Sequence, residues 1–281
     1  MCLILFAWQT RPDLPLVIAA NRDEIRSRAT LALHRWPDLP IIAGRDELAG
    51  GTWMGVSADD PYRVAAVTNV RTGLVDGNDP SRASKRSRGR LPVDYLVGDS
   101  TPKDYAIALV SDAAHYEPVN LLVADADELW WATTWPEPIA RRVEPGVHGI
   151  SNAELDSRWP KVIDGTARLT TVLSSDRPDA DPEPYFDLLA DRRRASDDAL
   201  PATGVPEAFE RALSPIFIDI PASAMPVGRD GIRAGDYGTR ASTVLRVGGD
   251  GHGQVTERRF LARAEPLGES TVRFAEKRFA G

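Results

Sequence analysis

Short apolar runs separated by turn residues dominate the first 70 positions of the chain. "CLILFAW" and "LPLVIAAN" flank "QTRPD", in which Pro12 and Asp13 favour a turn. These runs predict a hairpin with two largely buried strands. Three more short strands are predicted at "PIIAG", "GTWMGVS" and "RVAAVTNVR", the last rich in Val and Thr. We therefore expect this region to form a mostly antiparallel sheet with short connections.

The apolar spacing then changes to three and four residues, which predicts helices. Thr101 is the expected N-cap of one of them, with Pro102 at its first helical position. The predicted helices are "LPVDYLVG", "TPKDYAIALVSDAAHY", "SRWPKVIDGTARLTTVLSS" and "DPEPYFDLLADRRR". The remaining predicted strands are "VNLLVAD", "ELWWATT", "RRVEPGVHGIS", "TRASTVLRVGG", "GQVTERRFLA" and "STVRFAEKRFA".

This order of strands, helices, strands, helices and strands predicts an α+β fold with stacked layers, because alternating βαβ units are absent from the pattern. The length of 281 residues is compatible with one large domain or two small ones. The chain shows neither an internal repeat nor a clean linker.

Composition and charge narrow the functional classes. The net charge of −7 argues against a nucleic-acid-binding surface, which usually carries a basic field. No apolar run is long enough to span a membrane, so we expect a cytoplasmic protein. The one cysteine cannot form an internal disulfide, and no Cys/His cluster supports a structural zinc site. No glycine-rich nucleotide-binding loop is present.

The stretch from residue 71 to 90 is basic, rich in Gly and Ser, and without apolar periodicity. It predicts a long loop that is either a solvated surface loop or functional. Its part from Arg82 to Arg90 could clamp a phosphate or carboxylate group, and Arg71 and Arg88 are binding candidates from the stretch. The cluster of Trp130, Trp131 and Trp135 is better explained by core packing than as a ligand platform.

Cys2 is either a small buried apolar residue or a nucleophile. Removal of Met1 would put a thiol and a free α-amine on one residue, and an α-amine has a pKa near 7.7–8.0, suited to a base at neutral pH. A nucleophile activated by its own amine is a known catalytic arrangement. Such a site needs a carboxylate to orient the amine, positive charge near the thiol, and donors for an oxyanion.

The predicted second strand ends in "ANRDE", which would lie beside Cys2 in a hairpin. Alternation puts Asn21 and Asp23 on one face, and Arg22 and Glu24 on the other. Asp23 is the candidate to hold the ammonium, and Arg22 to lie against the sulfur. The alternative is that four polar residues simply end a strand.

Six ordered motifs give the chain a resemblance to the NRDE family, also called the transport and Golgi organisation 2 family. They are "MCLILFAW…LVIAANRDE", "GGTWMGVS", "AAVTNVR", "SRGRL", "GISNAELDSRWPKV" and "YGTRASTVL", and they cover residues 2 to about 245. The resemblance implies a single domain over residues 1–281. Members of the family are discussed in connection with haem trafficking, acyl-lipid metabolism and Golgi organisation.

The chain also resembles, more distantly, cysteine-type N-terminal nucleophile (Ntn) hydrolases of the bile-salt hydrolase and penicillin V acylase kind. This implies a four-layer αββα sandwich of two antiparallel sheets flanked by helices. By this resemblance Cys2 is the nucleophile, Asp23 orients the amine, Asn152 and Asn69 are oxyanion donors, and Arg240 favours the thiolate. Asn21, Arg22, Glu24 and Trp53 complete the binding candidates, with Trp53 in a glycine turn beside the cysteine.

One departure from the hydrolase pattern concerns Arg22 and Asp23, which are adjacent here and separated by two residues in those hydrolases. Both can point at Cys2 only if the strand bends or bulges. Otherwise Arg240 acts on the thiol alone, or Arg22 is structural.

Two functions are therefore expected. The first is an Ntn-type hydrolase that cleaves an amide or thioester of an apolar acyl group, with no cofactor required. The second is a non-catalytic carrier for a hydrophobic ligand such as haem or an acyl-CoA, in which Cys2 contacts the ligand.

Overall fold

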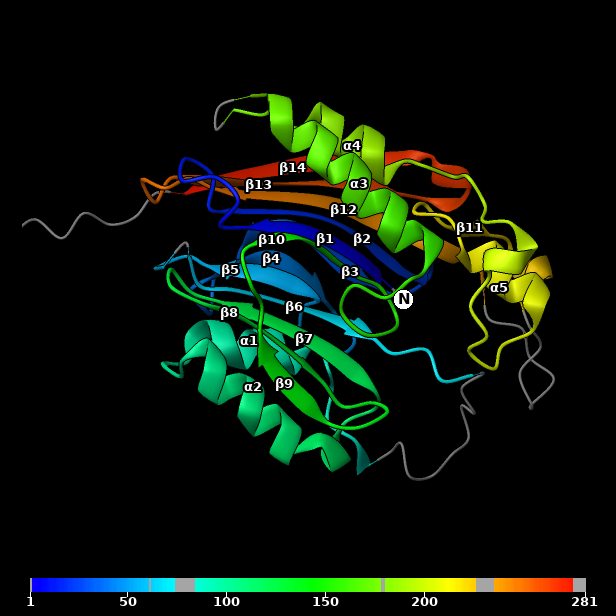
Figure 1. Ribbon diagram of the computed structural model, residues 1–281, viewed down its shortest axis with the longest axis horizontal. Helices are drawn as coiled ribbons and strands as arrows, with labels where there is room; N and C mark the ends of the chain where they lie inside the picture. Colours follow the sequence, from blue (N-terminus) through cyan, green and yellow to red (C-terminus); the bar gives the residue numbers. More distant parts are fainter. Residues whose placement is uncertain (1, 61, 74–83, 178–179, 226–234, 275–281) are drawn as a thin grey trace, which may run out of the picture.

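Two β-sheets lie face to face and helices cover their outer faces, as Figure 1 shows. The computed structural model describes residues 2–60, 62–73, 84–177, 180–225 and 235–274. This arrangement is the four-layer αββα sandwich that the sequence predicts. Every strand pair in the two sheets is antiparallel.

The first sheet has the strand order β10-β1-β2-β12-β13-β14, with β11 paired to β12. Its strands are β1 (Cys2–Trp8), β2 (Leu16–Ile25), β10 (Gly146–Ile150), β11 (Asp219–Ile220), β12 (Tyr237–Val247), β13 (Gly253–Phe260) and β14 (Pro266–Phe274). The predicted hairpin of the first two strands is confirmed. Strands from the two ends of the chain thus lie side by side, because β12 pairs with the free edge of β2.

The second sheet follows the chain order from β3 to β9. Its strands are β3 (Thr30–Arg35), β4 (Ile41–Asp46), β5 (Met54–Ser57), β6 (Val64–Asn69), β7 (Val119–Ala124), β8 (Leu129–Thr133) and β9 (Ile139–Arg142). Each strand pairs with the next through a short turn, apart from the helical insertion between β6 and β7.

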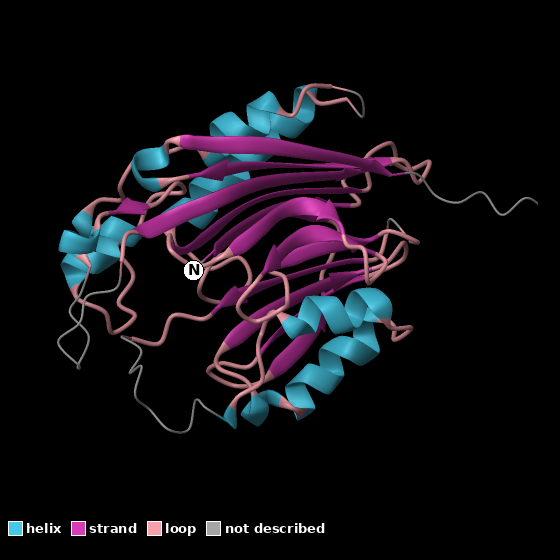
Figure 2. Cartoon of the chain, turned by 180° about the vertical axis from the view of Figure 1, so that it is seen from behind, coloured by secondary structure: helices cyan, strands magenta, loops and turns pink. Residues whose placement is uncertain are grey.

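The helices divide between the two sheets, as Figure 2 shows from behind. They are α1 (Arg90–Val97), α2 (Pro102–Ser111), α3 (Pro160–Ser175), α4 (Glu183–Leu189) and α5 (Glu207–Leu213). Helices α1 and α2 cover the second sheet, α3 and α4 cover the first, and α5 packs beside β11 and β12. Thr101 caps α2 as predicted, since its side chain accepts a hydrogen bond from the N–H of Asp104.

Both faces of β1 are buried, which explains its uninterrupted apolar sequence. Ile4, Phe6 and Trp8 point into the layer between the sheets. Leu3 and Leu5 point the other way, into the layer under α3 and α4. The middle of the sandwich therefore fixes β1 from two sides, and Cys2 begins this strand.

Two sequence predictions need correction. The strands of the first 70 residues do not form one sheet, because the outer edge of β2 is occupied by β12 and the chain crosses to the second sheet at β3. The single strand expected at "RRVEPGVHGIS" is two strands, β9 and β10, which belong to different sheets. The sequence pattern also missed β3 and α5, which are short and only partly buried.

Glu257 on β13 links the two sheets from inside the sandwich. It is 1% exposed, and its Oε1 accepts a hydrogen bond of 2.8 Å from the N–H of Leu33 on β3. Burial raises the pKa of Glu257 to about 7, although the Leu33 N–H and the charges of Arg259 and Arg22 oppose the rise. The native protein therefore holds this proton in a pH range where the unfolded chain has lost it.

We expect Glu257→Gln to change how stability depends on pH. A raised native pKa stabilises the fold below the ordinary carboxyl pKa, and this contribution is lost as pH rises through 7. The natural chain should lose stability between pH 5 and pH 8, and the variant should not. The difference in free energy of unfolding, variant minus natural chain, should therefore rise by up to about 3 kcal/mol over this range. Urea unfolding at both pH values measures this difference. Glu269→Gln on the exposed strand β14 is the control, and equal pH dependence of variant and natural chain would contradict the prediction.

Candidate active site

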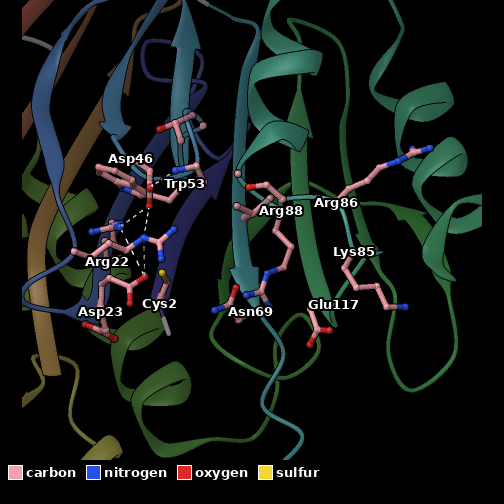
Figure 3. A pocket seen from close by; sticks show the side chains of 18 residues that line it. Cys2, Arg22, Asp23, Asp46, Trp53, Asn69, Lys85, Arg86, Arg88 and Glu117 are labelled. Atoms are coloured by element: carbon pink, nitrogen blue, oxygen red, sulfur yellow. Dashed lines mark hydrogen bonds and ion pairs between the residues drawn. The ribbon is translucent and has the colours of Figure 1, made fainter. Parts of the chain in front are cut away.

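Cys2 lies directly opposite Arg22 in the pairing of β1 with β2. Side chains of such a pair lie on the same face of the sheet with their Cβ atoms about 5 Å apart. Both residues line a cavity of about 250 Å³ between the ends of these strands, the end of β6 and residues 85–89. Figure 3 shows Cys2 and Arg22 on one wall of this cysteine cavity, and Asn69 and Arg88 on the facing wall.

Arg22 is held firmly for a charged side chain. It is 6% exposed, and its guanidinium lies over the Trp53 ring, 4.4 Å from the centroid. Its Nη2 lies 3.5 Å from Asp46 Oδ2 and 3.8 Å from Glu24 Oε2. Its Nη1 is buried and has no hydrogen-bond partner among the residues that the structure describes. The residue paired with Cys2 therefore keeps one unused hydrogen-bond donor among the described residues.

Two glycine contacts fix the walls of the cysteine cavity. A Cβ on Gly44 would lie 2.3 Å from the indole of Trp53, so this position in β4 leaves room for the ring under Arg22. A Cβ on Gly51 would lie 2.4 Å from the carbonyl oxygen of Gly89. The motifs "GGTW" and "SRGRL" therefore meet backbone to backbone, and this contact places Arg88 at the cavity.

The surroundings of the thiol act in opposite directions on its ionisation. Burial raises the pKa of the Cys2 thiol, and the Asp23 carboxylate adds to the rise. The backbone N–H of Asp23 and the Arg22 guanidinium lower this pKa. Burial is the largest of these effects, so the thiol stays neutral near pH 7 unless positive charge is added beside it.

Asp23 lies on the opposite face of β2 from Arg22, as alternation predicts. It is 2% exposed, and its Oδ1 accepts a hydrogen bond of 2.7 Å from Thr239 Oγ1 on β12. The register of β12 shifts between Thr239 and Ala241, so Arg240 forms a bulge opposite Arg22 and Asp23. The irregularity lies in β12 and not in β2, the strand for which the sequence analysis set a bend or bulge as the condition. Both Arg22 and Asp23 nevertheless line the cysteine cavity.

Lys161 in the first turn of α3 adds a buried cation that the sequence analysis missed. It is 5% exposed, and its Nζ donates to the carbonyl oxygen of Leu213 at 3.1 Å. Burial and the charge of Arg71 lower the pKa of Lys161 to about 8, against the attraction of Asp23 and Cys2. Burial likewise raises the pKa of Asp23, and Lys161 opposes that rise. The sequence contained a signal for this burial. Lys161 stands four residues before Gly165, so the two lie on the same face of α3, and that face is buried.

The cysteine cavity brings together many of the predicted residues. Those that line it are Cys2, Arg22, Asp23, Glu24, Trp53, Asn69 and Arg88. The sequence analysis missed Asp46, which accepts hydrogen bonds from the N–H groups of Leu48 and Ala49 and ion-pairs with Arg28. Its position before a tight turn in "RDELAGG" was the available signal.

Other predicted residues lie outside this cavity. Asn21 points to the helix side of its sheet and donates to the carbonyl oxygens of Leu189 and Ile216 at 2.9 and 3.0 Å. Arg240 Nη1 donates to the carbonyl oxygens of Arg26 and Arg28 at 2.6 and 2.8 Å, in the turn after β2. The binding role of Asn21 and the thiolate role of Arg240 stay predictions.

Asn152 and Arg71 line a different cavity. Asn152 is fully buried, and its Nδ2 donates to the carbonyl oxygen of Asn69 at 2.7 Å. The N–H of Arg71 donates to the carbonyl oxygen of Asn152 at 2.8 Å. One amide hydrogen of Asn152 is therefore used to join this loop to β6. The oxyanion role stays a prediction, as does the role of the basic stretch, of which residues 74–83 lie outside the described residues.

The described residues contain no group of three or more His, Cys, Asp or Glu side chains that could hold a metal ion. None of the helices over the described ranges is both long and apolar enough to cross a membrane.

Comparisons with known proteins agree with the motifs and the fold. The family model of transport and Golgi organisation 2 matches residues 1–262. The chain belongs to this family. A transport and Golgi organization protein 2 homolog of Bos taurus is 29% identical, over 97% of this chain and 98% of its own. The human homolog is 28% identical, over 93% and 94%.

The fold can also be compared with that of a solved structure. The Caenorhabditis elegans ortholog of N-acylethanolamine-hydrolyzing acid amidase superposes with a TM-score of 0.50 and 12% identity, covering 87% of this chain and 92% of its own. At that identity the likeness shows the fold alone. It confirms the predicted Ntn-hydrolase-like fold class for this member of the family.

We expect the charge of Arg22 to control the reactivity of Cys2. Arg22→Met should raise the midpoint of the pH profile for thiol alkylation by about one unit, because an opposite charge near a thiolate is removed. Cys2 is the only cysteine, so iodoacetamide labelling followed by intact mass reports on this thiol alone. Arg22→Lys should keep the midpoint closer to that of the natural chain.

Arg86→Met is the matched control, since Arg86 lines the same cavity but its side chain is 56% exposed. Its profile should match that of the natural chain. A midpoint unchanged in Arg22→Met would show that the guanidinium does not act on the sulfur.

Proposed function

We propose that this chain is a cysteine-type N-terminal nucleophile hydrolase that cleaves an amide or thioester bond of an apolar acyl group. The observation that carries the proposal is the pairing of Cys2 with the buried Arg22, whose Nη1 has no hydrogen-bond partner among the described residues. A fold shared with an amidase supports it. Members of this fold use the first residue of the mature chain as nucleophile and base.

The reaction would begin after removal of Met1, which lies outside the described residues. The α-amine of Cys2 takes the thiol proton, and Sγ attacks the carbonyl carbon of the substrate. The tetrahedral adduct collapses, the bond to the leaving nitrogen or sulfur breaks, and the amine returns the proton to that atom. Water then attacks the acyl thioester with the same amine as base, which releases the acid and restores the thiol.

The surrounding residues would divide the remaining tasks. Asp23, fixed by Thr239, would orient the α-amine. Arg22 would stabilise the thiolate, a role for which its place opposite Cys2 gives more support than the carbonyl contacts of Arg240 give to that residue. Asn69 lines the cavity and would donate to the oxyanion, with Asn152 bonded behind it.

A carrier without catalytic activity is the second candidate. Burial raises the pKa of the Cys2 thiol, and a neutral thiol is a weaker nucleophile than a thiolate, which counts against the hydrolase. The ligand would be hydrophobic, either haem or an acyl-CoA or other lipid, in haem or lipid trafficking. A cytoplasmic location is part of this proposal and is supported by the single cysteine.

Intact mass of the natively expressed chain tests the hydrolase first. We expect a mass that lacks Met1 and adds one acyl group after incubation with an acyl thioester probe. Cys2→Ala should lose the labelling completely, because the chain has no second cysteine. Turnover of a panel of acyl amides and thioesters then defines the scissile bond.

Retention of Met1 in the native mass would overturn the hydrolase, because the amine of Cys2 would then be part of a peptide bond. Haem titration, followed by its absorption spectrum in the natural chain and in Cys2→Ala, tests the carrier. A thiolate-ligated spectrum that Cys2→Ala abolishes would favour the carrier over the hydrolase.

A further inference from the structure

Lys161 is a buried cation that the proposed reaction leaves without a task. It is 5% exposed and stands directly after Pro160, the first residue of α3. The first turn of a helix is an unfavourable place for a cation, because the helix dipole is positive at that end. Lys103 occupies the same position after Pro102 in α2, and it is exposed. Something other than the helix itself therefore holds Lys161 in the interior.

One hydrogen bond accounts for part of this burial. The Nζ of Lys161 donates to the carbonyl oxygen of Leu213, the last residue of α5, at 3.1 Å. A cation is favoured at such a helix C-terminus. An ammonium group has three donors, however, and the part of the chain that the structure describes gives it no second hydrogen bond and no direct ion pair. A buried ammonium with one neutral partner needs a compensating charge nearby.

Helix α3 places Lys161 at the Cys2 end of β1. A Cβ on Gly165 would lie 2.8 Å from the side chain of Leu5, so this part of α3 lies against the middle of β1. Arg11, which follows β1, donates to a carbonyl oxygen in the last turn of α3 at 2.9 Å. The helix therefore runs along β1 in the direction of the strand. Lys161, one turn before Gly165, lies toward Cys2 and not toward Arg11.

Asp23 lies on the same side of this sheet. Asn21, opposite Leu3 in the pairing of β1 with β2, bonds to carbonyl oxygens on the helix side, and Asp23 follows it by two residues. Each of the two buried charges acts on the other. The ammonium of Lys161 lowers the pKa of Asp23, and the carboxylate of Asp23 raises the pKa of Lys161. Lys161 and Asp23 are therefore opposite charges buried together at the Cys2 end of the hairpin.

The neighbouring titratable groups leave Asp23 as the carboxylate for Lys161. Glu210 on α5 is ion-paired with Arg71, and its Oε1 also accepts a hydrogen bond of 3.0 Å from a backbone N–H. Burial raises the pKa of Tyr237 on β12, so this phenol stays neutral at neutral pH. The groups that act on the charge of Lys161 are Cys2, Asp23, Arg71 and Glu210.

We propose that Lys161 is a positioning residue of the cysteine site, whose charge keeps Asp23 ionised so that the carboxylate can hold the α-amine of Cys2. The part that concerns the α-amine rests on the proposed function, whereas the pairing of Lys161 with Asp23 requires no turnover. Burial by itself favours the neutral form of the Asp23 carboxyl, and a neutral carboxyl does not attract an ammonium. The same cation disfavours a second positive charge at the α-amine, which keeps the amine available as a base.

A lysine titration tests the pairing without turnover. The chain has four lysines, so carbon NMR of isotope-labelled lysine gives few side-chain signals, and the one lost in Lys161→Arg belongs to Lys161. We expect it to titrate at about pH 8, and its midpoint to fall by about one pH unit in Asp23→Asn, because an opposite charge is removed. Asp23→Asn keeps the shape of the side chain and an acceptor for Thr239. The exposed Lys103 is the control within the same spectrum, and its midpoint should not change.

The pH profile of turnover tests the consequence for the α-amine. Lys161→Gln removes the charge and keeps a donor for the carbonyl oxygen of Leu213. We expect the acid limb of its kcat/KM profile to shift upward by about one pH unit, because both Asp23 and the α-amine would retain their protons to higher pH. Lys161→Arg keeps the charge and should bring the limb back toward that of the natural chain. Lys103→Gln, at the same position of α2, is the matched control and should leave the profile unchanged.

The outcomes separate this inference from the proposed function. A midpoint of Lys161 that depends on Asp23, in a chain without any turnover, would support the pairing and count against the hydrolase. Turnover whose acid limb is unchanged in Lys161→Gln would support the hydrolase and overturn the inference. A Lys161 midpoint at the ordinary value of about 10.4, or one that is unchanged in Asp23→Asn, would also overturn it and leave Lys161 as a cap of α5.

Discussion

The register of β1 against β2 is the constraint on which the rest of the site depends. Both faces of β1 are apolar and buried, so its own sequence does not distinguish one face from the other. The polar end of β2 distinguishes the two faces, because each polar residue there has its partners on one face only. Asn21 bonds to main-chain carbonyls on the helix side, and Arg22 packs on Trp53 from the opposite sheet. A slip of one residue would leave these groups buried without partners, at a cost of several kcal/mol.

Burial then sets the proton distribution around the cysteine. It raises the pKa of the Cys2 thiol and of Asp23, and it lowers the pKa of Lys161 to about 8. Each of these changes disfavours the charged form. The attraction between Asp23 and Lys161 opposes the change at both residues, whereas the Asp23 carboxylate adds to the rise at Cys2. The pKa of the thiol thus moves away from neutral pH, so the proposed hydrolase needs a base that takes the thiol proton, which is the task given to the α-amine.

The sequence was sufficient for what depends on neighbouring residues. The hairpin, the alternation of Asn21, Arg22 and Asp23, and the cap at Thr101 are local, and the structure confirms them. The pairing of β2 with β12 joins residues more than 200 positions apart, and apolar periodicity carries no information about such partners. The place of Arg240 depends on a bulge in that same pairing, so its side chain could not be placed from the sequence. Lys161 was readable in principle, as a cation within the apolar stripe of α3.

The bulge also bears on which arginine serves the thiol. Arg240 is the extra residue in β12, and its guanidinium satisfies main-chain carbonyls that end β2, so it stabilises the turn behind the site. Arg22 keeps its Nη1 buried without a hydrogen-bond partner among the described residues. An unmade hydrogen bond of a buried charged group costs about 1–3 kcal/mol or more. The fold retains this cost at the residue opposite its only cysteine. We therefore infer that the missing acceptor is the thiolate or an oxygen atom of the ligand.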